Sequence, residues 1–201
     1  MTGAVIYTCS HRRGGNSDRA AALLAEGVRD AGGAAEILPL RDYEIQHCLA
    51  CGFCDKHTDK RDRDRCALGR KDQAWEAFAP LFTARTVLLA SPVYFYHLPS
   101  RLKAWIDRGQ QFWTARRGGE PWVADLPERA VRAVLVAGQP GGEKLFEGAR
   151  LTLKYFFRNF NLTLADPLAL RGLDGPGDLR ARREFEEAVA ELGRAAWRES
   201  A

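Results

Sequence analysis

The sequence predicts an α/β fold in which a doubly wound parallel sheet carries helices on both faces. Three observations lead to this class. Short apolar segments at residues 4–8 and 35–40 flank an Ala- and Leu-rich helix at 20–31, which makes a βαβ unit with a right-handed crossover. Residues 87–91 form an apolar run without alternation, as expected for a strand covered on both faces. A further apolar run at 130–137 also stops in a turn, so two strand ends open onto one crevice.

Length and composition indicate one ordinary domain spanning residues 1–201. Apolar residues make up 46% and charged residues 28% of the chain, which is typical of soluble globular proteins. No apolar run approaches the ~20 residues needed to cross a bilayer, so we expect no membrane association. The chain opens directly on strand-like residues without a basic leader, which predicts a cytoplasmic protein. The net charge of +4 comes from interspersed acids and bases and gives no argument for nucleic-acid binding.

The turn after the first strand combines glycines with hydroxyl, amide and guanidinium groups. A helix follows at once, and the exposed amides of a helix N-terminus, together with the helix dipole, favour an anion. The turn lacks the Lys-Ser/Thr ending of a Walker A loop and does not match GxGxxG. The alternative is that Asn16 or Ser17 simply caps an ordinary helix. The clustering favours a phosphate site that consists of Ser10, Arg12, Asn16 and Ser17.

A second unusual segment holds four of the five cysteines within nineteen residues, namely Cys48, Cys51, Cys54 and Cys66. In a cytoplasmic protein such spacing indicates metal or redox chemistry more than structural disulfides. Three thiolates at C-x2-C-x2-C spacing, with a fourth further on, suit an iron–sulfur cluster. Zinc, with His57 as a substitute ligand, is the competing metal, and uncoordinated thiols are the remaining alternative. The cysteines belong to a polar insertion at about 48–70, in which residues 55–65 are predicted to be a solvated loop of alternating charge.

The central strand runs into three consecutive aromatic residues. Pro92 cannot donate to a central ladder, so the chain leaves the sheet there. In open parallel α/β sheets, ligands lie just beyond the carboxyl ends of the strands. Tyr94, Phe95 and Tyr96 therefore stand where a flat, mostly apolar ligand could lie. The alternative is that these rings only cover the edge of the sheet.

Apolar residues at helical spacing predict the remaining helices, at residues 71–82, 98–108, 145–160 and 178–198. The second of these is amphipathic, and surface or inter-subunit ion pairs are predicted for its charged residues Lys103, Asp107 and Arg108. Residues 116–122 are predicted to form a polar excursion. The strand at 130–137 ends in a glycine-rich turn at 138–143, and the last strand is predicted at 162–170.

Four short motifs follow one another along the first 143 residues: Ser10-x-Arg12-x-x-Gly15-Asn16-Ser17, the Cys48–Cys54 segment, Ser91-Pro92-Val93-Tyr94 and Leu102-Lys103-x-x-x-Asp107-Arg108. In this order and separation they resemble the flavodoxin-like NAD(P)H-dependent FMN reductase family. The cysteine segment is most similar to the iron–sulfur flavoprotein branch of that family. The resemblance implies a five-stranded parallel sheet of order 2-1-3-4-5, with FMN bound at its carboxyl edge.

The resemblance also implies roles for individual residues. The FMN phosphate would be held by Ser10, Arg12, Asn16 and Ser17. The isoalloxazine ring would be lined, largely through backbone groups, by Pro92, Val93 and Tyr94, with Phe95 beside them. The polar edge of the ring would meet the turn that contains Gly138, Gly141 and Gly142. No general acid or base is implied, so the catalytic side chains stay unassigned.

The activity that this resemblance implies is that of an FMN-dependent oxidoreductase. Electrons would pass from NADH or NADPH through the flavin to a quinone, nitro compound, metal ion or free flavin. One alternative is an electron carrier with FMN and a [4Fe-4S] cluster that a protein partner reduces, and another is a non-enzymatic zinc or thiol module. Cys66 stands further from Cys54 than in that branch, and its usual acidic pair is reduced to Lys71-Asp72. Family members are commonly dimers or tetramers, so a homodimer or homotetramer is expected.

Overall fold

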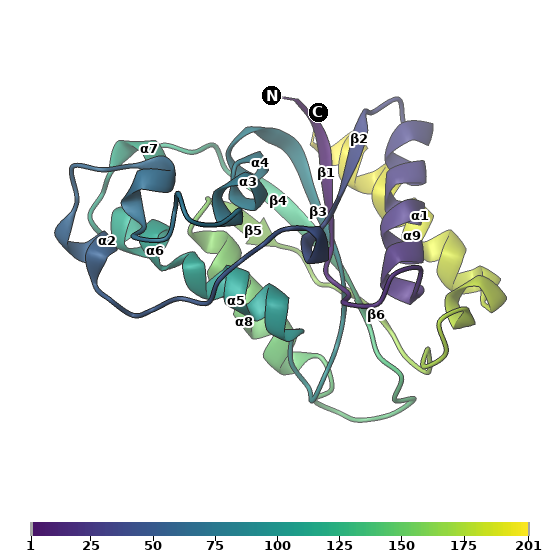
Figure 1. The fold of residues 1–201 in the computed structure, drawn as a ribbon. Coiled ribbons are helices and arrows are strands. Elements are labelled where there is room, and N and C mark those ends of the chain that lie inside the picture. Colours follow the sequence, from purple (N-terminus) through teal and green to yellow (C-terminus); the bar gives the residue numbers. More distant parts are fainter. Residues whose placement is uncertain (1, 201) are drawn as a thin grey trace.

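The computed structural model describes residues 2–200, and a parallel β-sheet forms its centre. The strands run in the order β2-β1-β3-β4-β5, with β6 also paired to β4, between two layers of helices (Figure 1). The predicted α/β class and strand order are therefore confirmed. The strands are β1 (Thr2–Thr8), β2 (Ala35–Pro39), β3 (Ala84–Pro92), β4 (Arg129–Val136), β5 (Leu162–Leu164) and β6 (Leu168–Leu170).

Helices cover both faces of the sheet. In Figure 1, α1 and α9 lie on one face, and α3, α4, α5, α6 and α8 lie on the other. Within residues 2–200, no helix combines the length and apolar character that a membrane crossing requires. The helices are α1 (Asn16–Asp30), α2 (Phe53–Lys56), α3 (Ala74–Phe78), α4 (Pro80–Thr83), α5 (Ser100–Arg108), α6 (Gln110–Arg117), α7 (Pro121–Ala124), α8 (Glu147–Arg158) and α9 (Arg183–Glu199), with short 3-10 turns η1 (Leu40–Asp42), η2 (Asp62–Arg65) and η3 (Asp178–Ala181).

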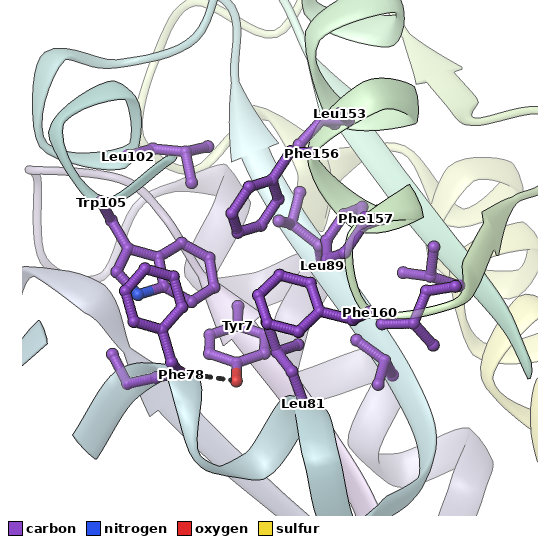
Figure 2. Packing of buried hydrophobic residues seen from close by; sticks show 14 of the residues in the cluster. Tyr7, Phe78, Leu81, Leu89, Leu102, Trp105, Leu153, Phe156, Phe157 and Phe160 are labelled. Atoms are coloured by element: carbon purple, nitrogen blue, oxygen red, sulfur yellow. Dashed lines mark hydrogen bonds between the residues drawn. The ribbon is translucent and has the colours of Figure 1, made fainter. Parts of the chain in front are cut away.

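Alternate strand residues point to the two helix layers and build two separate cores. In β1, Ile6 packs on the side of α1 and α9, whereas Tyr7 belongs to the opposite core. That opposite core is strongly aromatic, and Figure 2 shows Phe78 beside Trp105, with ring centroids 4.9 Å apart. The Tyr7 hydroxyl donates to the carbonyl oxygen of Ala77 at 2.8 Å. The core gives α5 and α6 a rigid support.

The prediction of a single last strand at 162–170 is wrong in one respect, because the structure has two short strands there. β5 pairs with residues 129–131 of β4, and β6 pairs with residues 134–136. Pro167 lies between them and has no N–H to continue the ladder. The fifth position in the sheet is therefore shared by two strands, and the sheet has six strands where five were predicted.

The insertion differs more from its prediction. Residues 55–65 are not simply a solvated loop, because they contribute to α2 and form η2, and the Arg65 side chain is only 1% exposed. The predicted polar excursion at 116–122 is also mostly helical: α6 ends at Arg117 and α7 begins at Pro121. In Figure 1 the insertion lies beside α6 and α7 at one end of the molecule.

Candidate functional site

Loops at the carboxyl edge of the sheet enclose a cavity of about 160 Å³, called here the carboxyl-edge cavity. Its walls come from the segments that follow β1, β3, β4 and β6, near the bottom of Figure 1. Because all these strands are parallel, their ends meet at one edge. The structure thus brings together the four residues predicted to bind phosphate, Ser10, Arg12, Asn16 and Ser17.

The N-terminus of α1 forms one side of the carboxyl-edge cavity. Gly15 is the N-cap and has no side chain to satisfy the first-turn amides. Such amides have no partner inside their own helix, and they carry the positive end of its dipole. Ser10, Arg12 and Ser17 line the cavity around them. The arrangement can hold a dianionic phosphate.

The Asn16 side chain is used within the protein. Its Nδ2 donates to the carbonyl oxygens of Leu173 at 3.1 Å and Gly175 at 2.8 Å, and its Oδ1 accepts from the Leu179 amide at 3.0 Å. The Asn16 side chain therefore holds the segment after β6 next to the cavity. Its backbone N–H is the group that Asn16 can offer to an anion. Leu173 and Asp174 line the cavity but are not among the predicted residues. The signal that could have found them is their position just after a strand of the same sheet.

Asp18 fixes the loop between β1 and α1. Its carboxylate accepts hydrogen bonds from the Thr8 hydroxyl at 2.6 Å, the Gly14 amide at 2.7 Å and Arg41 Nη1 at 2.8 Å. Burial opposes ionisation of Asp18, but these hydrogen bonds and the charge of Arg41 outweigh it and lower its pKa. The ionised Asp18 carboxylate thereby holds the loop between β1 and α1, although Asp18 does not line the carboxyl-edge cavity.

The aromatic residues after β3 form a tight turn with an unusual backbone. Phe95 and Tyr96 have φ angles of 49° and 62°, as the two central positions of a type I′ turn require. The backbones of Tyr94 and His97 exchange two hydrogen bonds of 2.9 Å, which close the turn. Positive φ is costly for bulky residues, and the fully exposed Phe95 has no packing to compensate. Strain of this kind is often found where a ligand binds.

A wider hollow of about 580 Å³ adjoins the carboxyl-edge cavity. Val93, Tyr94, Gly138 and Asp174 line both spaces, and the aromatic turn forms one wall of the wider hollow. A small space bordered by the start of α1 and by polar side chains therefore continues into a larger, more open one. This pair of spaces fits a molecule that joins a phosphate to a planar ring.

The predicted ring contacts are distributed over these two spaces. Pro92 lines the carboxyl-edge cavity and Phe95 lines the wider hollow. Gly141 and Gly142 lie further along the loop that contains Gly138. A Cβ placed on Gly141 would meet no atom within 4 Å, and Gly142 has a φ of 119°. This part of the loop is open to solvent, and contact of these two glycines with a ring stays a prediction.

The four cysteines of the insertion line one cavity of about 340 Å³, called here the cysteine cavity, which shares no lining residue with the carboxyl-edge cavity. Across residues 2–200, no three His, Cys, Asp or Glu side chains gather closely enough to hold a single metal ion. The four cysteines are distributed over the wall of one cavity and are not gathered at one point, which fits a cluster whose cysteines each bind a different iron. His57 stacks on Phe53, with ring centroids 3.8 Å apart.

A buried ion pair forms part of the wall of the cysteine cavity. Arg108, at the end of α5, pairs with Asp72, and both side chains are 1% exposed. The predicted surface pairing is therefore wrong for Arg108. It is correct for Lys103 and Asp107, which form an exposed pair at 2.6 Å. The difference lies in burial, because the surrounding chain covers the Arg108 side chain, whereas the side chains of Lys103 and Asp107 are 43% and 46% exposed.

A second ion pair, in which Arg65 is buried and Glu120 is 17% exposed, anchors the insertion to the residue that precedes α7. Arg65 donates to both carboxylate oxygens of Glu120, at 2.5 and 3.1 Å. It also donates to the carbonyl oxygens of His57 and Lys60, at 3.0 and 3.1 Å. Arg65 precedes Cys66 directly, so this pair helps to fix the position of the fourth cysteine in the wall of the cysteine cavity.

Known proteins with similar sequences are flavoproteins. The family model described as NADPH-dependent FMN reductase matches residues 1–157. An iron–sulfur flavoprotein of Methanosarcina thermophila is 29% identical over 99 residues, 49% of this chain and 48% of that protein. One of Archaeoglobus fulgidus is 31% identical over 88 residues, 44% of this chain and 39% of that protein. The chain thus matches less than half the length of these curated relatives.

A solved structure agrees with the predicted architecture. The NAD(P)H:quinone oxidoreductase from Methanothermobacter marburgensis superposes with a TM-score of 0.69, and the match covers 96% of each chain. The identity is 16%, so this likeness concerns the fold. The predicted flavodoxin-like fold is confirmed.

Proposed function

Because the chain belongs to the NADPH-dependent FMN reductase family, we propose that it is an oxidoreductase that passes electrons from NADH or NADPH through FMN to a small-molecule or metal acceptor. One observation carries this proposal. A cavity at the N-terminus of α1, with the unpaired first-turn amides and polar side chains suited to an anion, adjoins a wider hollow beside the aromatic turn. FMN joins a phosphate to a planar ring and matches these two spaces in order and in chemistry.

The groups that would bind FMN are mostly backbone amides and small polar side chains. The first-turn amides of α1 and the hydroxyls of Ser10 and Ser17 would donate to the phosphate, and Arg12 would add a positive charge. Val93 and Tyr94 would border the ring. Asp174 lines the junction of the two spaces, where its carboxylate would accept a hydrogen bond from a hydroxyl of the ligand.

The bound flavin would supply the redox chemistry, since FMN takes up two electrons and releases them singly or in pairs. The protein's part is to fix the ring, to border it with hydrogen-bonding groups and to leave one face open. The solvent-exposed Phe95 and the open surroundings of Gly141 support such access for donor and acceptor. We assign no side chain as general acid or base.

We propose further that Cys48, Cys51, Cys54 and Cys66 hold a [4Fe-4S] cluster. The four thiols line one cavity, and two matching relatives are named iron–sulfur flavoproteins. The long separation between the third and fourth cysteines does not oppose this, because α2 and η2 fold the connecting segment back. Zinc is the competing occupant.

Anaerobic purification of the full chain tests both proposals. We expect protein with flavin absorbance that binds added FMN and oxidises NADPH or NADH when a quinone is present. We also expect iron and sulfide on analysis. Colourless protein that fails to bind FMN would overturn the oxidoreductase proposal. Flavin-containing protein with zinc in place of iron would overturn the cluster alone.

A second candidate function is an electron-transfer protein that a protein partner reduces. The cysteine cavity favours it, because a cluster provides a one-electron route beside the flavin. In that case NADPH and NADH would reduce the flavin slowly, and a low-potential one-electron protein donor would reduce it rapidly. Stopped-flow measurement of flavin reduction by each donor separates the two functions.

We also propose that the chain forms a homodimer or homotetramer. Large apolar side chains are exposed on the aromatic turn and on α8, where Leu151 and Tyr155 are more than half exposed. The two segments are neighbours, since the Thr152 hydroxyl lies 3.1 Å from His97 Nε2. Apolar surface of this kind often marks a protein contact. Light scattering on purified protein tests this, and a monomer at all concentrations would contradict it.

A further inference from the structure

A stripe of buried polar residues faces the cysteines from α5 and α6. Its members are Arg108, Gln111 and Thr114, which stand three residues apart and so share one side of this helical path. As whole residues, side chain and backbone together, they are only 2%, 3% and 5% exposed. Arg108 and Gln111 line the cysteine cavity. The Thr114 hydroxyl donates to the carbonyl oxygen of Gln111 at 3.0 Å and lies close enough to the Cys54 sulfur to interact with it, so a Cys54 thiolate would offer this hydroxyl a second acceptor.

The guanidinium of Arg108 has fewer partners than its burial demands. Nη1 donates to the Asp72 carboxylate and to the carbonyl oxygen of Gln46. Nε and Nη2 are buried without a hydrogen-bond partner in residues 2–200, although the Cys66 thiol is near enough to interact with the guanidinium. A buried donor without a partner destabilises the fold. An acceptor inside the cysteine cavity would remove that destabilisation.

The surroundings of Arg108 indicate which acceptor fits. The cavity is lined by four thiols, and sulfur atoms of bound thiolate or sulfide accept hydrogen bonds from charged donors. Asp72 keeps the guanidinium in place, because its carboxylate also accepts from the amides of Gln46 at 2.9 Å and Ala74 at 3.1 Å. A fixed positive charge therefore faces the place where several thiolates would concentrate negative charge.

We propose that Arg108, assisted by Thr114, raises the reduction potential of the cluster in the cysteine cavity; this rests on the proposed [4Fe-4S] site. One-electron reduction, with the electron coming from reduced flavin, adds a negative charge beside the guanidinium and requires no proton. A nearby positive charge and hydrogen bonds to sulfur favour the more negative state and so raise the potential. Asp72 acts as a positioning residue for Arg108.

The test compares the midpoint potential of the cluster in four full-length proteins purified anaerobically, followed by electron paramagnetic resonance during a redox titration. The variants are Arg108→Gln, Thr114→Val and, as a control, Arg129→Gln. Arg129 is also a buried guanidinium, but it donates to the carbonyl oxygens of Leu81 and Ala84 and does not line the cysteine cavity. In Arg108→Gln, Asp72 keeps its two backbone partners.

We expect a more negative potential in Arg108→Gln, with the ratio of reduced to oxidised cluster about tenfold lower at the wild-type midpoint. Thr114→Val should also make the midpoint potential more negative, but by a smaller amount. Arg129→Gln should leave the midpoint potential unchanged. Unchanged potentials in both cavity variants, with full iron content, would overturn the inference alone. If Arg108→Gln loses its cluster, the potential of Thr114→Val decides: a more negative value supports the inference, and an unchanged value overturns it. Wild-type protein without iron would instead overturn the cluster proposal on which the inference rests.

Discussion

The carboxyl-edge cavity and the cysteine cavity lie in one chain but are built from different groups. The first is formed by loops that end parallel strands, and its main donors are backbone amides at the start of α1. The second is formed by an insertion, and its walls include the buried charge of Arg108. The first therefore depends on the geometry of the sheet, and the second depends on specific ion pairs.

This difference has an energetic consequence. Backbone amides at a helix end are available without cost, because the helix leaves them unpaired in any case. Buried ion pairs are costly to desolvate, and removing one partner leaves an uncompensated charge. The insertion should thus be sensitive to single charge substitutions, whereas a charge substitution among the residues that line the carboxyl-edge cavity should reduce mainly the affinity for the ligand.

Replacing Arg65 by Met should have the largest effect. The Glu120 carboxylate, which is 17% exposed, would lose its buried guanidinium partner, and we expect the free energy of unfolding to fall by about 3 kcal/mol in urea denaturation. The matched control is Arg183→Met on α9, which breaks an exposed pair with Glu187 and should cost at most about 0.5 kcal/mol. Similar small losses in both variants would show that apolar contacts hold the insertion in place.

Replacing Arg12 by Ala should weaken FMN binding about 10- to 100-fold, because a charge-assisted hydrogen bond to the phosphate is lost. Arg12 is exposed, so stability should not change. Titration of apoprotein with FMN, followed by flavin fluorescence, measures the affinity. Arg13→Ala is the matched control, since Arg13 is exposed but pairs with Asp42. Equal losses of affinity in both variants would indicate a general charge effect and contradict the assignment of Arg12.

Replacing Asp18 by Asn tests how the loop at the carboxyl edge is held. Because the pKa of Asp18 is lowered by folding, its ionised form stabilises the fold at neutral pH, and this contribution disappears as pH falls through the folded value. The wild type should exceed the variant by about 1–2 kcal/mol at pH 7. The two should converge as pH falls below about 4. A gap that stays constant in urea denaturation at acid pH would show that the charge is not needed.

Replacing Phe95 by Gly should have the smallest effect and the opposite sign. Glycine adopts positive φ without steric cost, and the exposed ring has no packing to lose. We expect the protein to gain about 1 kcal/mol in free energy of unfolding. Thermal and urea denaturation measure the gain. A loss of stability would mean that the ring is held by contacts, such as those of a second subunit.

The sequence was sufficient for the fold and for most of the carboxyl edge, because the signals there are local. The apolar strands, the glycine-containing turn before α1 and Pro92 at the end of β3 each act on their immediate neighbours. Parallel strands then bring their ends together without further information. The split between β5 and β6 has a local signal as well, since Pro167 cannot donate to a ladder.

The wall of the cysteine cavity could not be predicted, because its pairs are distant in sequence. Arg108 and Asp72 are 36 positions apart, and Arg65 and Glu120 are 55 positions apart. An arginine in an amphipathic helix has the same local pattern whether it faces solvent or a buried carboxylate. Only the folded structure distinguishes Arg108 from Lys103, which lies on the same helix and is exposed.

We propose that the chain has two separately built cofactor sites, and the cofactor content of the Cys51→Ser protein tests this most directly. Cys51 is an exposed residue of the insertion, so its substitution should leave the fold intact. We predict that the variant, purified anaerobically beside the wild type, keeps a full complement of FMN and loses its iron and sulfide. Loss of FMN together with iron, or iron content equal to that of the wild type, would contradict the account.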